Sequence, residues 1–417
     1  MKLLYISRLF SGLESSFKNQ IWKPNGVPTI FKMIEYLDKY HDVNFIFTVK
    51  DSGNDFKSTW KKKHDQEFYI KGLNNKVKIL TGINFFSYLG KNKINILIRE
   101  IRHLIIILYQ IYTFKPRIIY IDNSNIFTAS ILSRLFRKRN IVLRIMGVYP
   151  YMKLILKVNS FKNIINKYAY NSKYNLVICT QDGSGVTKWC SNALNKVTEY
   201  KILLNGINKI NYTNQIDDRI KNIPRDKFNV LYIGKLEEYK GIKEFVKSLL
   251  ILNTKFPNIF HGVIIGDGNE KKWIKEAINK KKNENLFTHI DNLSHDQIYH
   301  AHKKTNLYVS LNKYGNLSNV NLEAIFYGNC IIIPESDNLN EVDLETDEIL
   351  NKDAVIRIKR NNITKNLSNM IYTLYSNPKL VHQKKKNLKK LSNKIIRSWD
   401  DRINDELNII EERFYKL

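Results

Sequence analysis

The chain has 417 residues, of which 43% are hydrophobic and 12% aromatic, and a formal net charge of +29. The length predicts two domains of about 200 residues each, and the hydrophobic content excludes a disordered protein. The positive charge favours anionic partners such as phospholipid headgroups, sugar phosphates or nucleic acid, although a Lys-, Asn- and Ile-rich composition is also the bias of an AT-rich genome.

Cysteine spacing and hydropathy limit the compartment in which the protein works. The three cysteines have no C-x-x-C spacing and make no disulfide framework, which favours a reducing compartment. The apolar run Met1–Ile6 is soon broken by Arg8, so no signal peptide is expected. The longest apolar run, Leu104–Tyr109, is much shorter than the roughly 20 residues of a membrane-spanning helix. We therefore expect a cytoplasmic protein that is soluble or attached to the membrane surface.

Short β-branched runs alternate with helical periods along the chain, which is typical of parallel α/β layers. In the first domain, residues 1–204, the predicted strands are Leu3–Ile6, Asn44–Phe47, Ile118–Ile121, Ile141–Leu143 and Leu176–Ile178. Residues 205–227 are polar and contain Pro224, which predicts an interdomain linker. In the second domain, residues 228–393, the predicted strands are Val230–Ile233, Gly262–Ile265, Leu307–Ser310 and Cys330–Ile333.

Residues 394–417 predict an amphipathic C-terminal helix, because apolar residues recur there three or four positions apart. These residues are Ile396, Trp399, Ile403, Leu407 and Ile410.

Several motifs that would define other enzyme classes are missing. No G-x-G-x-x-G follows the first strand, and the chain has no G-x-x-x-x-G-K-[ST], no H-E-x-x-H and no D-x-D. His300 and His302 lie on one predicted helix, but side chains two positions apart point in different directions, which predicts a surface pair. We therefore expect neither a metal site nor an organic cofactor.

A basic loop follows the first predicted strand of the second domain. It runs from Gly234 to Ile242 and carries Lys235 and Lys240. The carboxyl ends of parallel strands form the usual ligand-binding edge of a sheet, so two cations in this loop favour an anionic ligand. The alternative is that these are two ordinary solvated lysines of a Lys-rich chain.

The segment Lys313–Ile333 predicts a polar loop, a short helix that begins near Ser318 or Asn319, and a buried strand. Free N–H groups and the helix dipole at such a start form an anion site, and together with two lysines they suit a diphosphate. Glu323 lies one turn deeper, where it is placed to accept hydrogen bonds from a ribose diol. A Glu in the first turn also complements the helix dipole, which is the structural alternative.

Taken in order, these segments resemble the group 1 glycosyltransferases, a retaining family with the GT-B fold. "YIGKLEEYKGIKEFV" (232–246) is similar to the family's strand, basic loop and helix, and "VIIGDGNEKKWI" (263–274) is similar to its V-G-D-G-P-x-x segment. "LLNGIN" (203–208) resembles the N-G-V-D that precedes the second domain, and "SWDDR" (398–402) the start of the C-terminal helix. The resemblance implies two Rossmann-like parallel-sheet domains that face a cleft, with the C-terminal helix crossing back to the first domain.

The resemblance also implies a donor, a UDP- or GDP-linked sugar, bound mostly on the second domain. Lys235 and Lys240 would neutralise the diphosphate and stabilise it as it leaves, and Glu323 would hold the ribose. The other implied donor-binding residues are Asn319, Val320, Ser318, Leu317, Asn316, Gly234, Leu293 beside the base, and Gly26 in a first-domain loop. The implied reaction is metal-independent transfer with retention to a glycan or lipid-linked acceptor, as in the synthesis of a bacterial surface polysaccharide.

The sequence departs from the family pattern at two positions. Gly315 stands where the earlier of the family's two glutamates lies, and Met146 stands in the region of its first-domain His. Both departures remove contacts to the transferred sugar and none to the nucleotide.

Two other functions are open. A non-catalytic GT-B-like scaffold subunit that binds nucleotide or glycan is favoured by these departures and opposed by the intact phosphate loop. A nucleic-acid-binding protein is motivated by charge alone, since no helix-turn-helix, zinc pattern or aromatic-interleaved basic motif is present. We expect no nucleic-acid partner.

Two first-domain segments, Ser58–Asp65 and Asn84–Leu104, predict contact with an anionic membrane. Aromatic residues such as Trp60 stand there beside cations such as Arg99 and Arg102, the composition of an interfacial segment. The alternative is a solvated Lys-rich face over core aromatics. The prediction is peripheral attachment at the inner face of the cytoplasmic membrane.

Overall fold

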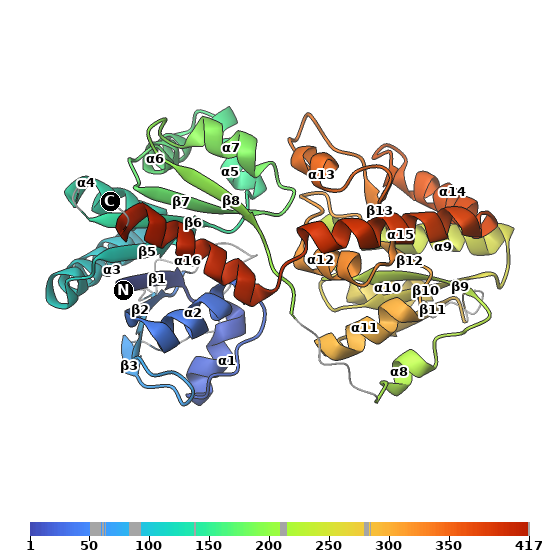
Figure 1. Cartoon of the computed structure of the whole chain (residues 1–417), viewed down its shortest axis with the longest axis horizontal. Coiled ribbons are helices and arrows are strands. Elements are labelled where there is room, and N and C mark those ends of the chain that lie inside the picture. The colour runs from blue at the N-terminus through green and yellow to red at the C-terminus, as the bar shows by residue number, and fades with distance from the viewer. Residues whose placement is uncertain are drawn as a thin grey trace. The chain divides into compact units, whose positions relative to one another are not determined.

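The computed structural model describes residues 1–50, 60, 62, 64–82, 93–136, 139–208, 215–278, 283 and 285–415. The chain divides into two compact units, each built on a mostly parallel sheet with helices packed on it (Figure 1). The first unit comprises residues 1–180, 186–204 and 399–417, and the second comprises residues 181–185 and 205–398.

The sheet of the first unit has the strand order β3-β4-β2-β1-β5-β6-β7-β8. Its strands are β1 (Lys2–Arg8), β2 (Asp42–Thr48), β3 (Gln66–Phe68), β4 (Val77–Leu80), β5 (Ile118–Asp122), β6 (Asn140–Ile145), β7 (Leu176–Gln181) and β8 (Tyr200–Leu204). The strand β1 pairs in parallel with β2 and β5, whereas β3 is antiparallel to β4.

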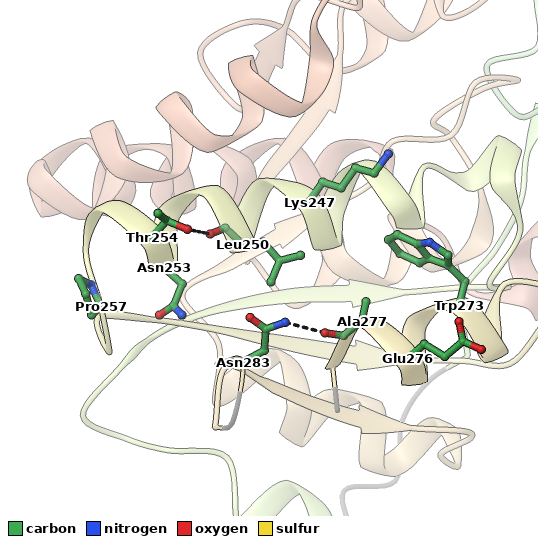
Figure 2. Close-up of a pocket in the computed structure, with 9 residues that line it drawn as sticks. All are labelled: Lys247, Leu250, Asn253, Thr254, Pro257, Trp273, Glu276, Ala277 and Asn283. Carbon is green, nitrogen blue, oxygen red and sulfur yellow. Dashed lines mark hydrogen bonds between the residues drawn. The ribbon is translucent and has the colours of Figure 1, made fainter. Parts of the chain in front are cut away.

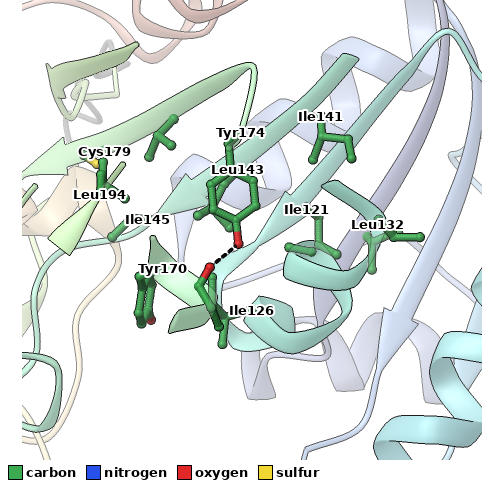
Figure 3. Packing of buried hydrophobic residues seen from close by; sticks show 14 of the residues in the cluster. Ile121, Ile126, Leu132, Ile141, Leu143, Ile145, Tyr170, Tyr174, Cys179 and Leu194 are labelled. Atoms are coloured by element: carbon green, nitrogen blue, oxygen red, sulfur yellow. Dashed lines mark hydrogen bonds between the residues drawn. The ribbon is translucent and has the colours of Figure 1, made fainter. Parts of the chain in front are cut away.

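Two layers of helices cover the two faces of this sheet. One layer contains α1 (Ser11–Asn19), α2 (Pro28–Tyr40) and α16 (Trp399–Tyr415). The other contains α3 (Lys93–Phe114), α4 (Ile126–Leu135), α5 (Pro150–Lys157), α6 (Phe161–Tyr170) and α7 (Val186–Ala193). Side chains along β1 alternate between the two cores, with Leu3 and Tyr5 facing the first layer and Leu4 and Ile6 the second, as the two-residue period of a strand requires. Figure 3 shows the second core, packed around Leu143 and Tyr170.

The C-terminal helix α16 belongs to the first unit, so its predicted return to the first domain is confirmed. Figure 1 shows it beside α2, and its apolar Ile403, Leu407 and Ile410 are buried. Glu406 on the same helix is fully buried, with Oε1 3.4 Å from Nε of Arg144 and Oε2 2.8 Å from Nη1 of Arg402. The helix therefore brings to the sheet both apolar surface and the carboxylate that neutralises a buried cation.

The sheet of the second unit has the order β11-β10-β9-β12-β13-β14, and all of its pairs are parallel. Its strands are β9 (Phe228–Ile233), β10 (Phe260–Ile265), β11 (Phe287–Ile290), β12 (Leu307–Val309), β13 (Cys330–Pro334) and β14 (Ile356–Ile358). Its helices are α8 (Asp218–Lys221), α9 (Ile242–Lys255), α10 (Lys271–Ile278), α11 (His295–Lys303), α12 (Asn319–Phe326), α13 (Leu344–Ile349), α14 (Ile363–Ser376) and α15 (Pro378–Ile395). The strand order reverses between β9 and β12, and ligands bind at such a switch point in open α/β sheets.

In the predicted membrane segments, the described side chains that carried the prediction are buried or paired, whereas Lys62, Ile96, Leu97 and Ile101 are exposed. Trp60 is only 7% exposed and belongs to the core with Phe47. Arg99 is buried against Glu100, and Arg102 bonds to Asp65. These side chains are already paired or desolvated, so they are not available to lipid. Several aromatic residues and lysines of the same two segments lie outside the described residues, among them Lys61, Lys63, Phe85, Phe86, Tyr88, Leu89 and Lys91.

Among the described residues, no helix combines the length and the apolar character needed to cross a membrane.

Candidate active site

The basic loop follows β9 and packs on the chain that follows β12. The N–H of Gly234 donates to the carbonyl of Ile265 (3.0 Å), and the Leu236 side chain is buried, so the loop is fixed at its start. At its end Gly241 has φ +74°, and a Cβ there would lie 2.4 Å from Cβ of Leu311. Only glycine fits this contact, which holds the two lysines at the switch point of the sheet.

The Lys240 ammonium is the most unusual charge in this loop. Its Nζ lies 5.3 Å from the centre of the Tyr239 ring, which stacks on Tyr314 with the ring centres 5.1 Å apart. Burial lowers the Lys240 pKa to about 8; the charge of Asp182 acts against this, and the exposed Lys235 adds to it. Among the described residues none accepts a hydrogen bond from Nζ, so a desolvated cation is left for an anionic ligand to pair.

The start of α12 offers hydrogen-bond donors. Ser318 is its N-cap residue but makes no side-chain cap. Within the described part of the chain, the N–H groups of Asn319 and Val320 have no acceptor. The Asn319 side chain accepts a hydrogen bond from Nδ2 of Asn205 (2.7 Å), which ties the segment "LLNGIN" to this helix start.

Asn316 and Leu317, both predicted to bind the donor, face inward. The N–H and Nδ2 of Asn316 each donate to the Asp343 carboxylate at 2.7 Å, and its side chain is fully buried. The N–H of Leu317 donates to the carbonyl of Asp182 (3.1 Å), and its side chain is also buried. Their donors are therefore occupied within the protein, and these two residues shape the loop that leads to α12.

The glycine at position 315 is explained by packing. Gly315 has φ +139°, and a Cβ there would lie 2.5 Å from the carbonyl oxygen of Asp182 and 2.9 Å from the nitrogen of Ser184. The short segment 181–185 therefore occupies the space that any side chain at 315 would enter. Gly183 in that segment is equally confined, with its Cβ position 2.5 Å from Oδ1 of Asp343. A glutamate at 315 is incompatible with this arrangement.

Asp182 brings a carboxylate to this place that was missed in the sequence. Its Oδ1 accepts hydrogen bonds from the Ser184 N–H (3.0 Å) and the Ser184 hydroxyl. Burial raises the Asp182 pKa to about 6, although these hydrogen bonds oppose the shift, and its charge acts on Lys240. The signal was the polar, glycine-rich "QDGSG" (181–185), two residues after the predicted strand Leu176–Ile178, at the edge where parallel sheets present ligand-binding residues.

Glu323 has a partner that the sequence did not predict. Its side chain is nearly buried, and Oε1 lies 3.3 Å from Nδ1 of His295 at the start of α11. The hydrogen bond to Glu323 raises the His295 pKa. Leu293, expected to flank the base, lies two residues before His295, in the loop that leads into α11.

The predicted first-domain residues belong to the first unit. Gly26 has φ +79° and stands beside Asn25, whose N–H donates to the carbonyl of Gly12 (3.0 Å). Met146, in the region of the family's His, packs against the core of the first unit.

The prediction of a surface His pair is wrong for His302. Its ring is buried against Tyr308 and Tyr327, and burial lowers its pKa to about 3. It faces inward because α11 packs this side on the sheet. The described residues contain no cluster of three His, Cys, Asp or Glu that would hold a metal ion.

A pocket of about 610 Å³ lies apart from these residues, between α9 and α10. Figure 2 shows Lys247 and Trp273 at one end and Asn253 and Asn283 towards the other. None of the predicted site residues lines it.

Comparison with solved structures identifies the fold. Sucrose-phosphate synthase from Thermosynechococcus elongatus is similar over the whole of both chains, with a TM-score of 0.69 and 12% identity. HepE from Anabaena, solved in complex with UDP, is similar over 99% of this chain and all of its own, with a TM-score of 0.65 and 15% identity. The fold is therefore that of the GT-B glycosyltransferases, as the sequence predicted.

Sequence comparison matches part of the chain to a family of known enzymes. Residues 213–391 match the family model described as "Glycosyl transferases group 1". An uncharacterized glycosyltransferase from Methanocaldococcus jannaschii is 26% identical over 223 residues, which are 51% of this chain and 54% of that protein. The chain thus spans about half the length of this curated relative. The resemblance to group 1 glycosyltransferases is confirmed, and the residues that match the family model lie in the second unit.

Proposed function

We propose that the protein is a retaining, metal-independent glycosyltransferase that moves a hexose from a UDP- or GDP-sugar to a glycan or lipid-linked acceptor, in the synthesis of a bacterial surface polysaccharide. The observation that carries this proposal is the Lys240 ammonium, desolvated beside Lys235 and without an acceptor among the described residues. Such a cation is stabilised when a diphosphate binds it.

The proposed chemistry is electrostatic. As the sugar–phosphate bond breaks, negative charge develops on the leaving nucleoside diphosphate, and fixed cations stabilise it without reorganisation. Lys235 and Lys240 supply two charges, and the open N–H groups of Asn319 and Val320 supply dipoles. No step in this scheme needs a metal ion.

Glu323 is the proposed ligand of the ribose. Its carboxylate is fixed by His295 at 3.3 Å, which leaves a second oxygen to accept from a diol. The complex of HepE with UDP supports a uridine nucleotide as the first donor to test.

Asp182 is the proposed contact of the transferred sugar. Its backbone carbonyl lies against Gly315, where the family pattern has a glutamate, and the charge of its carboxylate acts on Lys240. A carboxylate held by Ser184 has a free oxygen for a sugar hydroxyl.

A non-catalytic scaffold is the second candidate, favoured by Gly315 and by the packing of the partly buried Met146 against the core. Both candidates bind nucleotide, so turnover separates them. The protein is incubated with UDP- and GDP-sugars, with and without lipid-linked and glycan acceptors, and released nucleoside diphosphate is measured. Catalysis predicts release with at least one donor and retention at the anomeric carbon. Nucleotide binding without release from any donor would support the scaffold.

The metal independence is tested in the same assay. Release is expected to be unchanged in the presence of a chelator. Activity lost with the chelator and restored by Mn²⁺ or Mg²⁺ would contradict this part of the proposal.

A further inference from the structure

The outer surface of one helix layer of the first unit is apolar where a soluble surface is normally polar. The helices α3, α4, α6 and α5 lie next to one another in that order over the same face of the sheet. Of the 26 large hydrophobic side chains that are exposed in the described chain, 17 lie on or beside these four helices, between Ile96 and Tyr168. We call these 17 side chains the apolar helix face.

On α3 the solvent side is entirely uncharged over four turns. Leu97, Ile101, Ile105, Tyr109 and Tyr112 recur at steps of four and three, and each is between 49% and 77% exposed. The charged residues of this stretch are turned inward, since Arg99 and Glu100 pair with each other and Glu100 also with Lys50. The usual arrangement of an amphipathic helix, apolar inside and polar outside, is therefore not followed on this helix.

The next helices continue the same surface. The exposed positions of α4 are Phe127, Ile131 and Leu135, one turn apart and all apolar. On α6, Phe161 is 80% and Tyr168 65% exposed. Apolar faces of this extent on a soluble protein mark a site of protein or membrane contact.

Charge distinguishes between these two kinds of partner. No Asp or Glu occurs between Asp122 and Asp182, whereas this stretch of 59 residues contains 10 Lys and Arg. The lysines Lys157, Lys162 and Lys167 are exposed among the apolar residues of α5 and α6. Apolar and aromatic side chains interleaved with lysines, without any acid, form the surface that lies at the interface of an anionic bilayer.

We propose that the apolar helix face docks the protein on an anionic phospholipid membrane. Its aromatic and aliphatic side chains enter the headgroup region, and the lysines of α5 and α6 contact the lipid phosphates. The proposed contact keeps the exposed part of the predicted segment Asn84–Leu104 that lies on α3, and it adds α4, α5 and α6, which were not predicted from sequence. It does not depend on the proposed transferase activity, because it is measured without substrate.

Co-sedimentation of the full chain with vesicles tests the proposal. One series contains zwitterionic phosphatidylcholine alone, and the other contains a third phosphatidylglycerol. We expect the wild type to sediment with the anionic vesicles and to be released as salt is raised, because screening weakens the lysine contribution. Partition into the zwitterionic vesicles should be at least ten-fold weaker.

Two variants separate the contributions, each with a matched control. Lys157→Glu/Lys162→Glu/Lys167→Glu should lower partition about a hundred-fold or more, since each cation near an anionic surface contributes roughly five-fold. The same change at the exposed Lys379, Lys386 and Lys390 of α15 alters net charge equally and should leave most of the binding intact. Phe161→Asp/Ile164→Asp should abolish binding, whereas Val197→Asp/Leu339→Asp, at exposed apolar positions elsewhere, should not.

Thermal unfolding confirms that each variant is folded, which is expected because the substituted side chains are exposed. Wild type that stays in the supernatant with anionic vesicles, or variants indistinguishable from their controls, would overturn the proposal. A wild-type dimer in solution that ignores vesicles and becomes monomeric in Phe161→Asp/Ile164→Asp would overturn it in favour of contact with a second copy of the chain.

Discussion

The two lysines of the basic loop have different environments, and this decides how each is expected to act. Lys235 is exposed, whereas Lys240 is half-buried and has a lowered pKa. In water the charge of Lys235 is screened, while the charge of Lys240 acts over a short, poorly solvated distance. Lys240 is therefore expected to contribute more to stabilising a leaving diphosphate.

Replacing these lysines tests their roles. Lys240→Ala should raise the activation free energy for kcat/KM by about 2–4 kcal/mol, because a charge-assisted bond to the leaving group is lost. Lys235→Ala should raise it by less. Nucleoside diphosphate release is the measurement, and Lys247→Ala on α9, away from the loop, is the control. Rates equal to wild type in both folded variants would exclude the site.

The pH profile follows from the Lys240 pKa of about 8. The protonated ammonium is the active form, so kcat/KM should fall above about pH 8 as the free enzyme loses this proton. Asp182 raises the Lys240 pKa, so Asp182→Asn should move the alkaline limb to lower pH. A limb that stays in place in Asp182→Asn would show that the two charges do not interact.

At the scale of elements, the need for glycine at position 315 comes from the segment 181–185, which occupies the space of a Cβ there, and not from the loop that contains Gly315. Gly315→Ala should lower the free energy of unfolding by roughly 1–3 kcal/mol, through a strained φ and a Cβ clash. Gly328→Ala is the control, since Gly328 also has positive φ but its Cβ position is open, with the nearest atom 3.8 Å away. Chemical denaturation measures both, and an equal loss of stability would contradict the packing argument. For the same reason Gly315→Glu should not increase activity.

The docking of α16 depends on Glu406. Burial alone would raise its pKa, but Arg144 and Arg402 hold it below the ordinary value. Glu406→Gln leaves two buried cations without a counter-charge and should cost about 3–5 kcal/mol of stability, with exposed Glu411→Gln on the same helix nearly neutral. Because the folded pKa is depressed, this stabilisation is present above the unfolded pKa and is lost as pH falls through the folded pKa. Equal denaturation midpoints for both variants would contradict it.

The long central strands were predictable, whereas the edge strands and the short β4 were not. Leu3–Ile6 and Val230–Ile233 lie within β1 and β9, which are buried on both faces and therefore consist of continuous apolar residues. The strands β3 and β8 form the edges of the first sheet. The sequence of β3, "QEF", is short and mostly polar, so it lacks the apolar run from which a strand is predicted. Burial on two faces left a pattern in the sequence that burial on one face did not.

The candidate site was predictable where it depends on local structure. Lys235 and Lys240 follow a recognisable strand, and their loop position follows from that strand alone. The neighbourhood of Gly315 and Asp182 was not predictable, because it joins segments more than 130 positions apart through backbone contacts. His295 was missed for the same reason, since its pairing with Glu323 depends on how α11 and α12 pack.

At the scale of the whole molecule, the second unit includes five residues, 181–185, that begin at the last residue of β7. Their backbone is bonded into the second unit: the N–H of Asp343 donates to the carbonyl of Gly183 (2.7 Å) and the N–H of Leu317 to that of Asp182. A fragment of residues 205–398 lacks these acceptors. It should unfold at a lower temperature than the same fragment carrying 181–185 on a flexible Gly/Ser tether, as thermal denaturation would measure. Equal melting temperatures would contradict a structural role for the segment.

The division of the chain at 180/181, 185/186, 204/205 and 398/399 means that the polypeptide crosses between the units four times. Neither unit is a contiguous stretch of sequence, so a ribosome completes the first unit only after it has made all of the second. A cut of the polypeptide at any one of these crossings would leave the two units joined through the other three. Truncation or domain exchange at residue 204 would therefore divide both units instead of separating them. Recombination with related proteins should be tolerated only where 181–185 stay with the second unit and 399–417 stay with the first.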